Sequence, residues 1–189
     1  EDLRRIYGEY AITVANDHAI APPKPPRKGL DAFDQVCEWL RKRNINCLAI
    51  TNWRLKNAYT IKTFTLSEHD LLRYIRCAKI FLWLSRGEGF GMPPVEAMSV
   101  KTLVVSSNAE FNSHIVGVKF EYESIEKVYM PETGRNYIAW IYDIRKVIDA
   151  VDYALSLSDD EREEIIKFAF EQSKLYDYRL VSKVLNEVI

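Results

Sequence analysis

Short apolar runs alternate with amphipathic segments along the first two thirds of the chain. Six runs are rich in apolar and β-branched residues, which predicts strands. They cover residues 11–16, 46–51, 59–64, 80–84, 102–106 and 115–120. Between them, apolar residues recur at helical spacing, which predicts helices over about 31–43, from Ser67 to about 78 and from Pro93 to about Ser99. This order predicts an α/β fold: a Rossmann-like, three-layer parallel sheet with helices on both faces.

The last third of the chain has only helical patterns. A helix is expected from Asp143 onward, and Ser158 with Glu161 three residues later resembles a capping box for a second helix. A third is expected to begin at Asp177 or Tyr178. The length of 189 residues is that of one domain. We therefore expect a single domain over residues 1–189, with a helical C-terminal part from about residue 143.

Composition excludes several classes of protein. Hydrophobic residues make up 48% and charged residues 28% of the chain, unlike a disordered polymer. The net charge of -1 gives no indication of nucleic-acid binding. The first half of the chain is more basic than the second, and we interpret this difference as two solvated surfaces of opposite charge. No apolar run approaches the ~18 residues of a membrane span. Three cysteines without a C-x-x-C pair predict reduced thiols, a cytoplasmic location and no metal site.

The segment from Ser85 to Met98 carries the clearest chemical signal. It follows a buried strand and contains three glycines before two prolines that favour the first turn of a helix. Glycines allow a ligand to approach the backbone closely, and a helix N-terminus attracts anions. Glu88 lies in the turn and Glu96 in the first turns of the helix, so both can face one crevice. Carboxylates accept hydrogen bonds from paired hydroxyls, as in a ligand with two sugar rings.

Residues 88–98 read EGFGMPPVEAM, which resembles the signature of retaining GT-B glycosyltransferases of the family-4 type (glycosyl transferases group 1). The family pattern is E-G-F-G-x-P-x-x-E-A-M. Similarity extends to residues 27–30, 71–85, 102–106 and 176–184, and thus over nearly the whole chain. The resemblance is to the C-terminal, donor-binding half of these enzymes. It implies a glycosyltransferase, or its donor-binding domain, that uses a nucleoside diphosphate sugar and no metal or other cofactor.

The resemblance implies a role for each candidate residue. Glu88 and Lys28 are the expected catalytic residues: Glu88 contacts the donor sugar, and Lys28 binds the diphosphate and stabilises the leaving group. The remaining candidates bind the donor. The backbone N–H groups of Phe90 and Gly91 contact sugar or phosphate, and Glu96 accepts hydrogen bonds from the ribose. Gly89 completes the loop.

The sequence departs from the family pattern where the family has Gly-Arg after the first strand. Here residues 15–18 read ANDH and a proline-rich loop follows. Arg27 or Lys24 is the candidate to replace that arginine. Beyond the fifth strand, Ser113 and His114 stand where a Glu is often found.

Three functional readings remain open from the sequence. The first is hexosyl transfer to an unknown glycan, lipid or protein acceptor. GT-B enzymes bind the acceptor on a separate N-terminal domain, so activity would need that domain, a partner or a homo-oligomer. The chain starts at Glu1 rather than Met, and is either a fragment or a stand-alone domain. The second reading is a non-catalytic module that binds a nucleotide or nucleotide sugar. The third is an interaction domain without a ligand.

Overall fold

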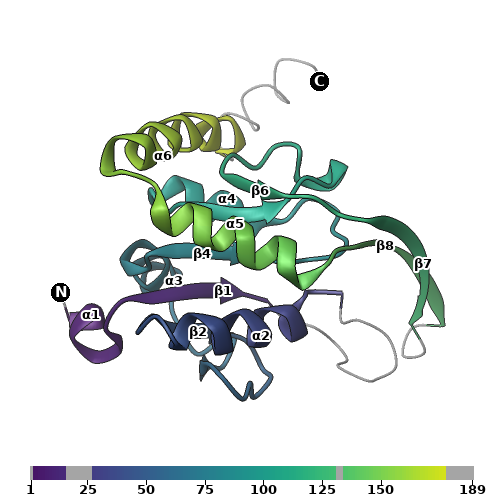
Figure 1. Ribbon diagram of the computed structural model, residues 1–189, viewed down its shortest axis with the longest axis horizontal. Coiled ribbons are helices and arrows are strands. Elements are labelled where there is room, and N and C mark those ends of the chain that lie inside the picture. The colour runs from purple at the N-terminus through teal and green to yellow at the C-terminus, as the bar shows by residue number, and fades with distance from the viewer. Residues whose placement is uncertain (1, 16–26, 131–133, 178–189) are drawn as a thin grey trace.

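The computed structural model describes residues 2–15, 27–130 and 134–177. Within them, six parallel strands form one sheet in the order β3-β2-β1-β4-β5-β6 (Figure 1). The strands are β1 (Tyr10–Val14), β2 (Asn46–Ile50), β3 (Tyr59–Ile61), β4 (Ile80–Trp83), β5 (Val104–Ser107) and β6 (Val118–Phe120). This is the predicted Rossmann-like α/β fold.

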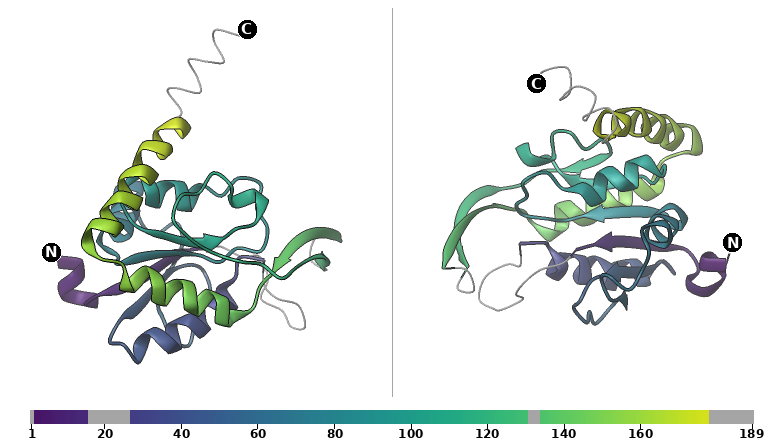
Figure 2. Two further views of the ribbon diagram at one scale, coloured as in Figure 1. Left: turned by 45° about the horizontal axis from the view of Figure 1, so that its top comes forward. Right: turned by 180° about the vertical axis from the view of Figure 1, so that it is seen from behind.

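Helices cover both faces of the sheet, as Figures 1 and 2 show. The helices are α1 (Asp2–Tyr7), α2 (Leu30–Arg41), α3 (Glu68–Cys77), α4 (Met92–Ser99), α5 (Ile144–Ser156) and α6 (Asp159–Ser173), with short 3-10 turns η1 (Glu110–Asn112) and η2 (Lys174–Tyr176). Helices α2 and α5 share one hydrophobic cluster with the sheet, and α3 and α4 share the cluster on the opposite face. Helix α6 packs against α4.

Side chains of the central strands alternate between these two clusters. Ala11 of β1 belongs to the cluster under α2 and α5, whereas its neighbours Tyr10 and Ile12 belong to the other. Successive side chains of a strand point to opposite faces of the sheet. Because both faces are covered by helices, β1, β4 and β5 are buried throughout. This explains why they read as continuous apolar runs in the sequence.

Two helix starts follow the capping pattern of the sequence. The side chain of Ser67 accepts a hydrogen bond from the backbone N–H of Asp70. Ser158 and Glu161 form a complete capping box at the start of α6. Both caps satisfy backbone donors that have no partner inside the helix, and the second does so as a full capping box.

A β-hairpin is the main feature that the sequence patterns did not predict. Strands β7 (Ser124–Met130) and β8 (Arg135–Ile141) pair in antiparallel fashion as a separate two-stranded sheet. Figure 1 shows the hairpin beyond the carboxyl ends of the parallel strands. It occupies the stretch between the predicted sixth strand and the helices from Asp143, for which no element was expected.

Several predicted bounds are too long. The third strand ends at Ile61, and Phe64 is 89% exposed with a positive φ of 68°, so it does not extend the strand. The sixth strand begins at Val118 rather than 115. The helix expected from Asp177 or Tyr178 and most of the proline-rich loop, with Lys24, lie outside the described residues.

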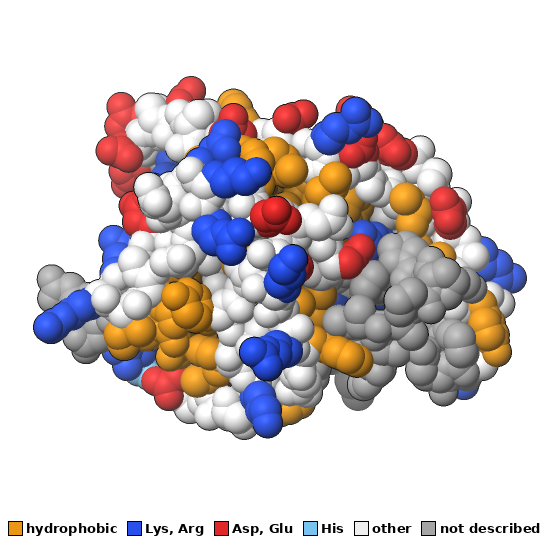
Figure 3. Space-filling model, turned by 60° about the horizontal axis from the view of Figure 1, so that its bottom comes forward, with side chains coloured by type: hydrophobic (Ala, Val, Ile, Leu, Met, Phe, Trp, Pro, Cys, Tyr) orange, Lys and Arg blue, Asp and Glu red, His pale blue; other side chains and the backbone are white. Residues whose placement is uncertain are grey.

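The surface mixes both charges. On the face in Figure 3, basic side chains run down the middle and acidic ones gather at the upper left. Cys37 and Cys47 are buried and Cys77 is half-buried, all as free thiols. Across the part of the chain that the structure describes, no helix is both long enough and apolar enough to cross a membrane.

Candidate functional site

The strand order creates a crevice at the centre of the sheet. Strands β1 and β4 are neighbours, but the chain leaves them in opposite directions: β1 leads to α2 on one face and β4 leads to α4 on the other. Open α/β sheets bind ligands at such a switch point, outside the carboxyl ends of the strands. The segments just before α2 and just after β4 therefore border the candidate site.

The glycine-rich loop enters α4 through a left-handed residue. Gly91 has a φ of 84° and is the N-cap of α4, and a Cβ there would lie 3.2 Å from the ring of Trp83. Both the backbone angle and the close approach require glycine. Gly89 differs, since a Cβ at this position would meet no other atom within 4 Å. Its side of the loop is open.

Lys28 and Glu88 meet across the switch point. The Nζ of Lys28 donates to Oε1 of Glu88 in an ion pair, and the hydroxyl of Ser85 donates to the same oxygen at 2.8 Å. The side chains are only 15% and 9% exposed. A charge that is largely removed from water is stable only when it is paired, so each of these two groups depends on the other.

Arg27 contributes its backbone to this arrangement. Its carbonyl accepts a hydrogen bond from the backbone N–H of Arg86 at 2.7 Å and lies 3.2 Å from the hydroxyl oxygen of Ser85, whose single proton is donated to Glu88. These contacts tie the segment before α2 to the loop after β4. Gly29 allows the same close approach, because a Cβ there would lie 1.9 Å from the carbonyl oxygen of Leu84.

Arg86 fixes the other side of the loop. Its guanidinium donates to both carboxylate oxygens of Asp31 at 2.8 and 2.9 Å, and lies 4.7 Å from the ring centre of Tyr142. Burial disfavours the charge of Arg86, but Tyr142 and Asp31 outweigh it and raise the pKa of the guanidinium. The carbonyl of Arg86 also accepts from the N–H of Trp140 at 2.8 Å, which joins the loop to the hairpin.

Glu96 lies one turn inside α4. Its carboxyl is partly buried, and its pKa is raised by this burial and by the negative charge of Glu68, the first residue of α3. The structure thus brings Lys28 and Glu88 together and places Glu96 beside α3. A crevice shared by Glu88 and Glu96 stays a prediction.

Phe90 packs against a residue that the sequence patterns did not assign to the site. Its ring stacks on His114 with centroids 4.3 Å apart, and Tyr176 meets both rings edge-on. Burial and nearby Lys119 lower the pKa of His114, so the ring is neutral at pH 7. This contact holds the exposed tip of the loop.

Two further features were missed by sequence reasoning. Ser85 and Arg86 lie within the segment from Ser85 to Met98 that the sequence analysis singled out. Their roles were missed because Lys28 and Asp31, which complete these contacts, are distant in the sequence. The hairpin also carried a signal: residues 137–142 form an apolar and aromatic run after the turn-forming letters PETG at 131–134.

The comparison with protein families identifies the family of this chain. The model of "Glycosyl transferases group 1" matches residues 49–172. The chain belongs to the glycosyl transferases group 1 family. The matched range contains the loop with Glu88 and Glu96, but it begins after Lys28.

Similar proteins carry consistent names. A protein of Acidianus filamentous virus 1, provisionally named glycosyltransferase ORF313, is 30% identical over 167 residues, which are 83% of this chain and 52% of that protein. The serotype-specific mannosyltransferase WbdA of Escherichia coli is 26% identical over 131 residues, 62% of this chain and 16% of that protein. The chain spans about half or less of the length of the curated relatives it matches.

Solved structures share the fold at low identity. The C-terminal domain of a group 1 glycosyl transferase (LpcC) from Francisella tularensis has a TM-score of 0.65 and 18% identity, covering 94% of this chain and 90% of that domain. WaaG, a glycosyltransferase involved in lipopolysaccharide biosynthesis, has a TM-score of 0.64 and 15% identity, covering 96% of this chain and 48% of that one. The fold is therefore that of a GT-B half-domain.

Proposed function

We propose that this chain binds a nucleoside diphosphate sugar and takes part in transferring its hexosyl group, with retention, to an acceptor hydroxyl. Membership of the glycosyltransferase family supports the reaction type. The observation that carries the proposal is the contact of Lys28 with Glu88 at the switch point of the sheet. It unites a cation suited to a diphosphate with a carboxylate suited to sugar hydroxyls.

Lys28 is the group for the diphosphate. During transfer, the bond from the anomeric carbon to the diphosphate oxygen breaks and negative charge grows on the leaving nucleoside diphosphate. An ammonium group in a partly dry site stabilises that charge more strongly than water does. Without donor, Glu88 supplies the counter-charge, so Lys28 is held in place before the donor arrives.

Glu88 and Glu96 are the groups for hydroxyls. When the diphosphate takes over Lys28, Glu88 becomes free to accept hydrogen bonds from the donor sugar, while Ser85 keeps its carboxylate oriented. Glu96 accepts from the ribose. The partly buried position of Glu96 beside the negative charge of Glu68 fits a group whose hydrogen bonds come from a ligand.

The backbone of the loop adds donors for anionic oxygens. The N–H groups of Phe90 and Gly91 have no hydrogen-bond acceptor among the described residues, and they precede the N-terminus of α4. Backbone donors at the start of a helix bind anions well. The bond that forms joins the anomeric carbon to the acceptor oxygen, whose proton passes to the departing phosphate oxygen.

In this proposal, the groups that bind the acceptor lie outside the described residues. The acceptor must be held in line with the anomeric carbon, and such positioning supplies much of the rate. Since the chain spans about half of its relatives, an N-terminal domain, a partner or a second copy would complete the cleft. The second candidate function is a module that binds the donor without transferring the sugar. It is favoured by the same observation, that the chain spans only about half the length of its relatives.

The test is isothermal titration calorimetry with a panel of nucleoside diphosphates and their sugar conjugates, followed by a transfer assay with the bound donor. We expect one member of the panel to bind at a single site. Binding without transfer, even after an N-terminal domain is added, would favour the module. Failure of the whole panel to bind would contradict both candidates and favour an interaction domain.

A further inference from the structure

A second pocket lies at the opposite edge of the sheet from the loop of the proposed donor site. Its volume is about 330 Å³, and its walls come from residues before β1, β4 and β5 and from α1, α3, α5 and α6. Because these residues precede parallel strands, the pocket opens at the amino edge of the sheet (Figure 1). It is therefore separated from the glycine-rich loop by the length of the strands.

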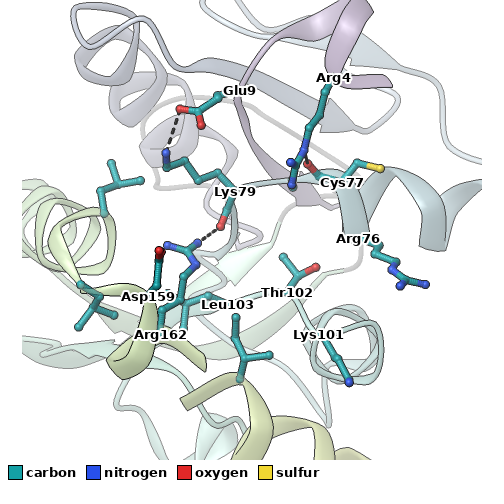
Figure 4. A pocket seen from close by; sticks show the side chains of 14 residues that line it. Arg4, Glu9, Arg76, Cys77, Lys79, Lys101, Thr102, Leu103, Asp159 and Arg162 are labelled. Atoms are coloured by element: carbon teal, nitrogen blue, oxygen red, sulfur yellow. Dashed lines mark hydrogen bonds and ion pairs between the residues drawn. The ribbon is translucent and has the colours of Figure 1, made fainter. Parts of the chain in front are cut away.

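Basic side chains dominate this amino-edge pocket. Five cations line it against two carboxylates, those of Glu9 and Asp159. The cations are Arg4, Arg76, Lys79, Lys101 and Arg162. Figure 4 shows Arg4 reaching down from α1 and Arg162 reaching up from α6 toward the region beside Lys79. Arg4, Lys79 and Arg162 thus bring positive charge from three segments of the chain to one hollow, and Arg76 and Lys101 line its edge.

Most of this charge is not neutralised by the carboxylates nearby. Lys79 forms an ion pair with Glu9 at 2.9 Å. Arg4 instead donates to the carbonyl of Cys77 at 3.4 Å, and Arg162 donates to the carbonyls of Lys79 and Ala154. A carbonyl satisfies a donor but carries no net charge, so these guanidinium groups keep their positive charge and their remaining N–H groups.

The side chain of Arg162 is partly buried. Burial lowers the pKa of its guanidinium, and the charges of Asp159 and Glu9 offset only part of this effect. Nearby negative charge favours the charged form of such a group. An anion in the pocket would therefore stabilise the arrangement that the fold already builds.

We propose that the amino-edge pocket binds a phosphate or diphosphate group, at a site separate from the proposed donor site. Planar guanidinium groups match phosphate oxygens with two parallel hydrogen bonds, and two of the cations approach from opposite walls. The volume is sufficient for a small phosphate-bearing ligand. The phosphate belongs either to a free metabolite or to the headgroup of an anionic lipid, because both present the same chemistry.

The test uses inorganic pyrophosphate and the intact chain, with binding followed residue by residue in ¹H–¹⁵N NMR spectra. Pyrophosphate is also expected at the donor site, so the position of the response distinguishes the two. We expect saturable shifts of the amides of Lys79, Lys101 and Arg162. Shifts confined to Gly87, Gly89 and their neighbours would overturn this proposal while supporting the donor site. Shifts at the amino edge alone would support this proposal and contradict the donor site.

Paired variants separate recognition from general charge. Arg4→Gln with Arg76→Gln removes two cations of the pocket, and Arg5→Gln with Arg73→Gln removes two from neighbouring positions of the same helices that do not line it. We expect the first pair to weaken binding at the amino edge about tenfold or more, since hydrogen bonds to charged groups are strong. The second pair should change it less than about twofold. Equal losses in both pairs would overturn the proposal.

A vesicle arm identifies the source of the phosphate. Co-sedimentation with phosphatidylglycerol vesicles, absent with phosphatidylcholine and lost in the Arg4→Gln/Arg76→Gln variant, would support a lipid headgroup. Pyrophosphate binding without co-sedimentation would support a free metabolite. Co-sedimentation that both paired variants retain equally, with no amino-edge shifts, would overturn the proposal.

Discussion

The two sides of the glycine-rich loop hold ion pairs of different kinds. Arg86, on the side facing α2 and the hairpin, is 6% exposed and binds both oxygens of Asp31 while lying over Tyr142. Two residues later, Glu88 faces the crevice and shares a single oxygen between Lys28 and Ser85. The first pair fixes the backbone of the loop. The second joins two charged side chains at the border of the crevice through a single carboxylate oxygen.

The comparison predicts the largest loss of stability at Asp31. Asp31→Ala leaves the buried guanidinium of Arg86 without a counter-charge. Removing one partner of a buried pair costs about 3–5 kcal/mol, and since Asp31 is 32% exposed we expect the lower end. The midpoint of thermal unfolding should fall by about 6–10 °C. Asp31→Asn keeps one hydrogen-bond acceptor for Arg86, so its unfolding midpoint should fall by less. If the midpoint of Asp31→Ala falls no further than that of Asp31→Asn, Arg86 does not fix the loop.

Neutralising Lys28 and Glu88 together should change stability little and ligand affinity strongly, the opposite of the expectation for Asp31. Lys28→Met combined with Glu88→Gln removes both charges together, so neither is left buried alone. We expect the unfolding midpoint to change by less than about 3 °C, while nucleoside diphosphate binding weakens about tenfold or more through the loss of a charge-assisted contact. Calorimetry and thermal unfolding on the same samples measure both. Unchanged affinity would remove Lys28 from the proposed site.

A smaller effect is expected at the tip of the loop. His114→Ala removes the ring that stacks on Phe90, so the loop is less well ordered before the donor binds, and we expect a two- to fivefold loss of donor affinity. His114→Phe keeps the stack and should recover most of the affinity. Titrations at pH 7 and pH 8 serve as a control, because both lie above the lowered pKa of His114 and a neutral ring that acts through packing should give the same loss at both. Equal losses for Ala and Phe would contradict the packing role.

The smallest effect concerns Glu96 and stability. Its pKa is raised by burial and by Glu68, so its contribution to stability is present below the unfolded pKa and is lost as the pH rises through the folded pKa. Glu96→Gln should therefore raise the unfolding midpoint by about 1–2 °C at pH 7 and have no effect near pH 4. Glu68→Gln is the matched control and should give a smaller gain at pH 7, because it removes only the like charge and leaves the carboxyl of Glu96 buried. Destabilisation by Glu96→Gln at pH 7 would contradict the assigned environment.

The sequence predicted the sheet better than it predicted contacts across the loop. Continuous apolar runs such as residues 80–84 are visible because strands buried on both faces leave no polar position. The start of α4 was predicted from Pro93 and Pro94, which act locally. Both features depend on residues that are close together in the chain.

Contacts between distant segments could not be predicted in the same way. Asp31 lies in the helix that was predicted over about 31–43, but nothing local in the sequence indicates that it binds Arg86, 55 residues away. Lys28 and Glu88 were both expected at the site, but not in contact with each other. The hairpin was missed although residues 137–142 form an apolar and aromatic run, because its strands pair with each other in a separate sheet outside the alternation of strands and helices.

The division of labour between Glu88 and Glu96 is the central claim, and calorimetry with one nucleoside diphosphate and its sugar conjugate tests it most directly. Glu96→Ala should weaken both ligands to the same degree, because both carry the ribose. Glu88→Ala should weaken only the sugar conjugate and leave the affinity for the bare nucleoside diphosphate within about twofold. Equal losses of both ligands in Glu88→Ala would contradict the account.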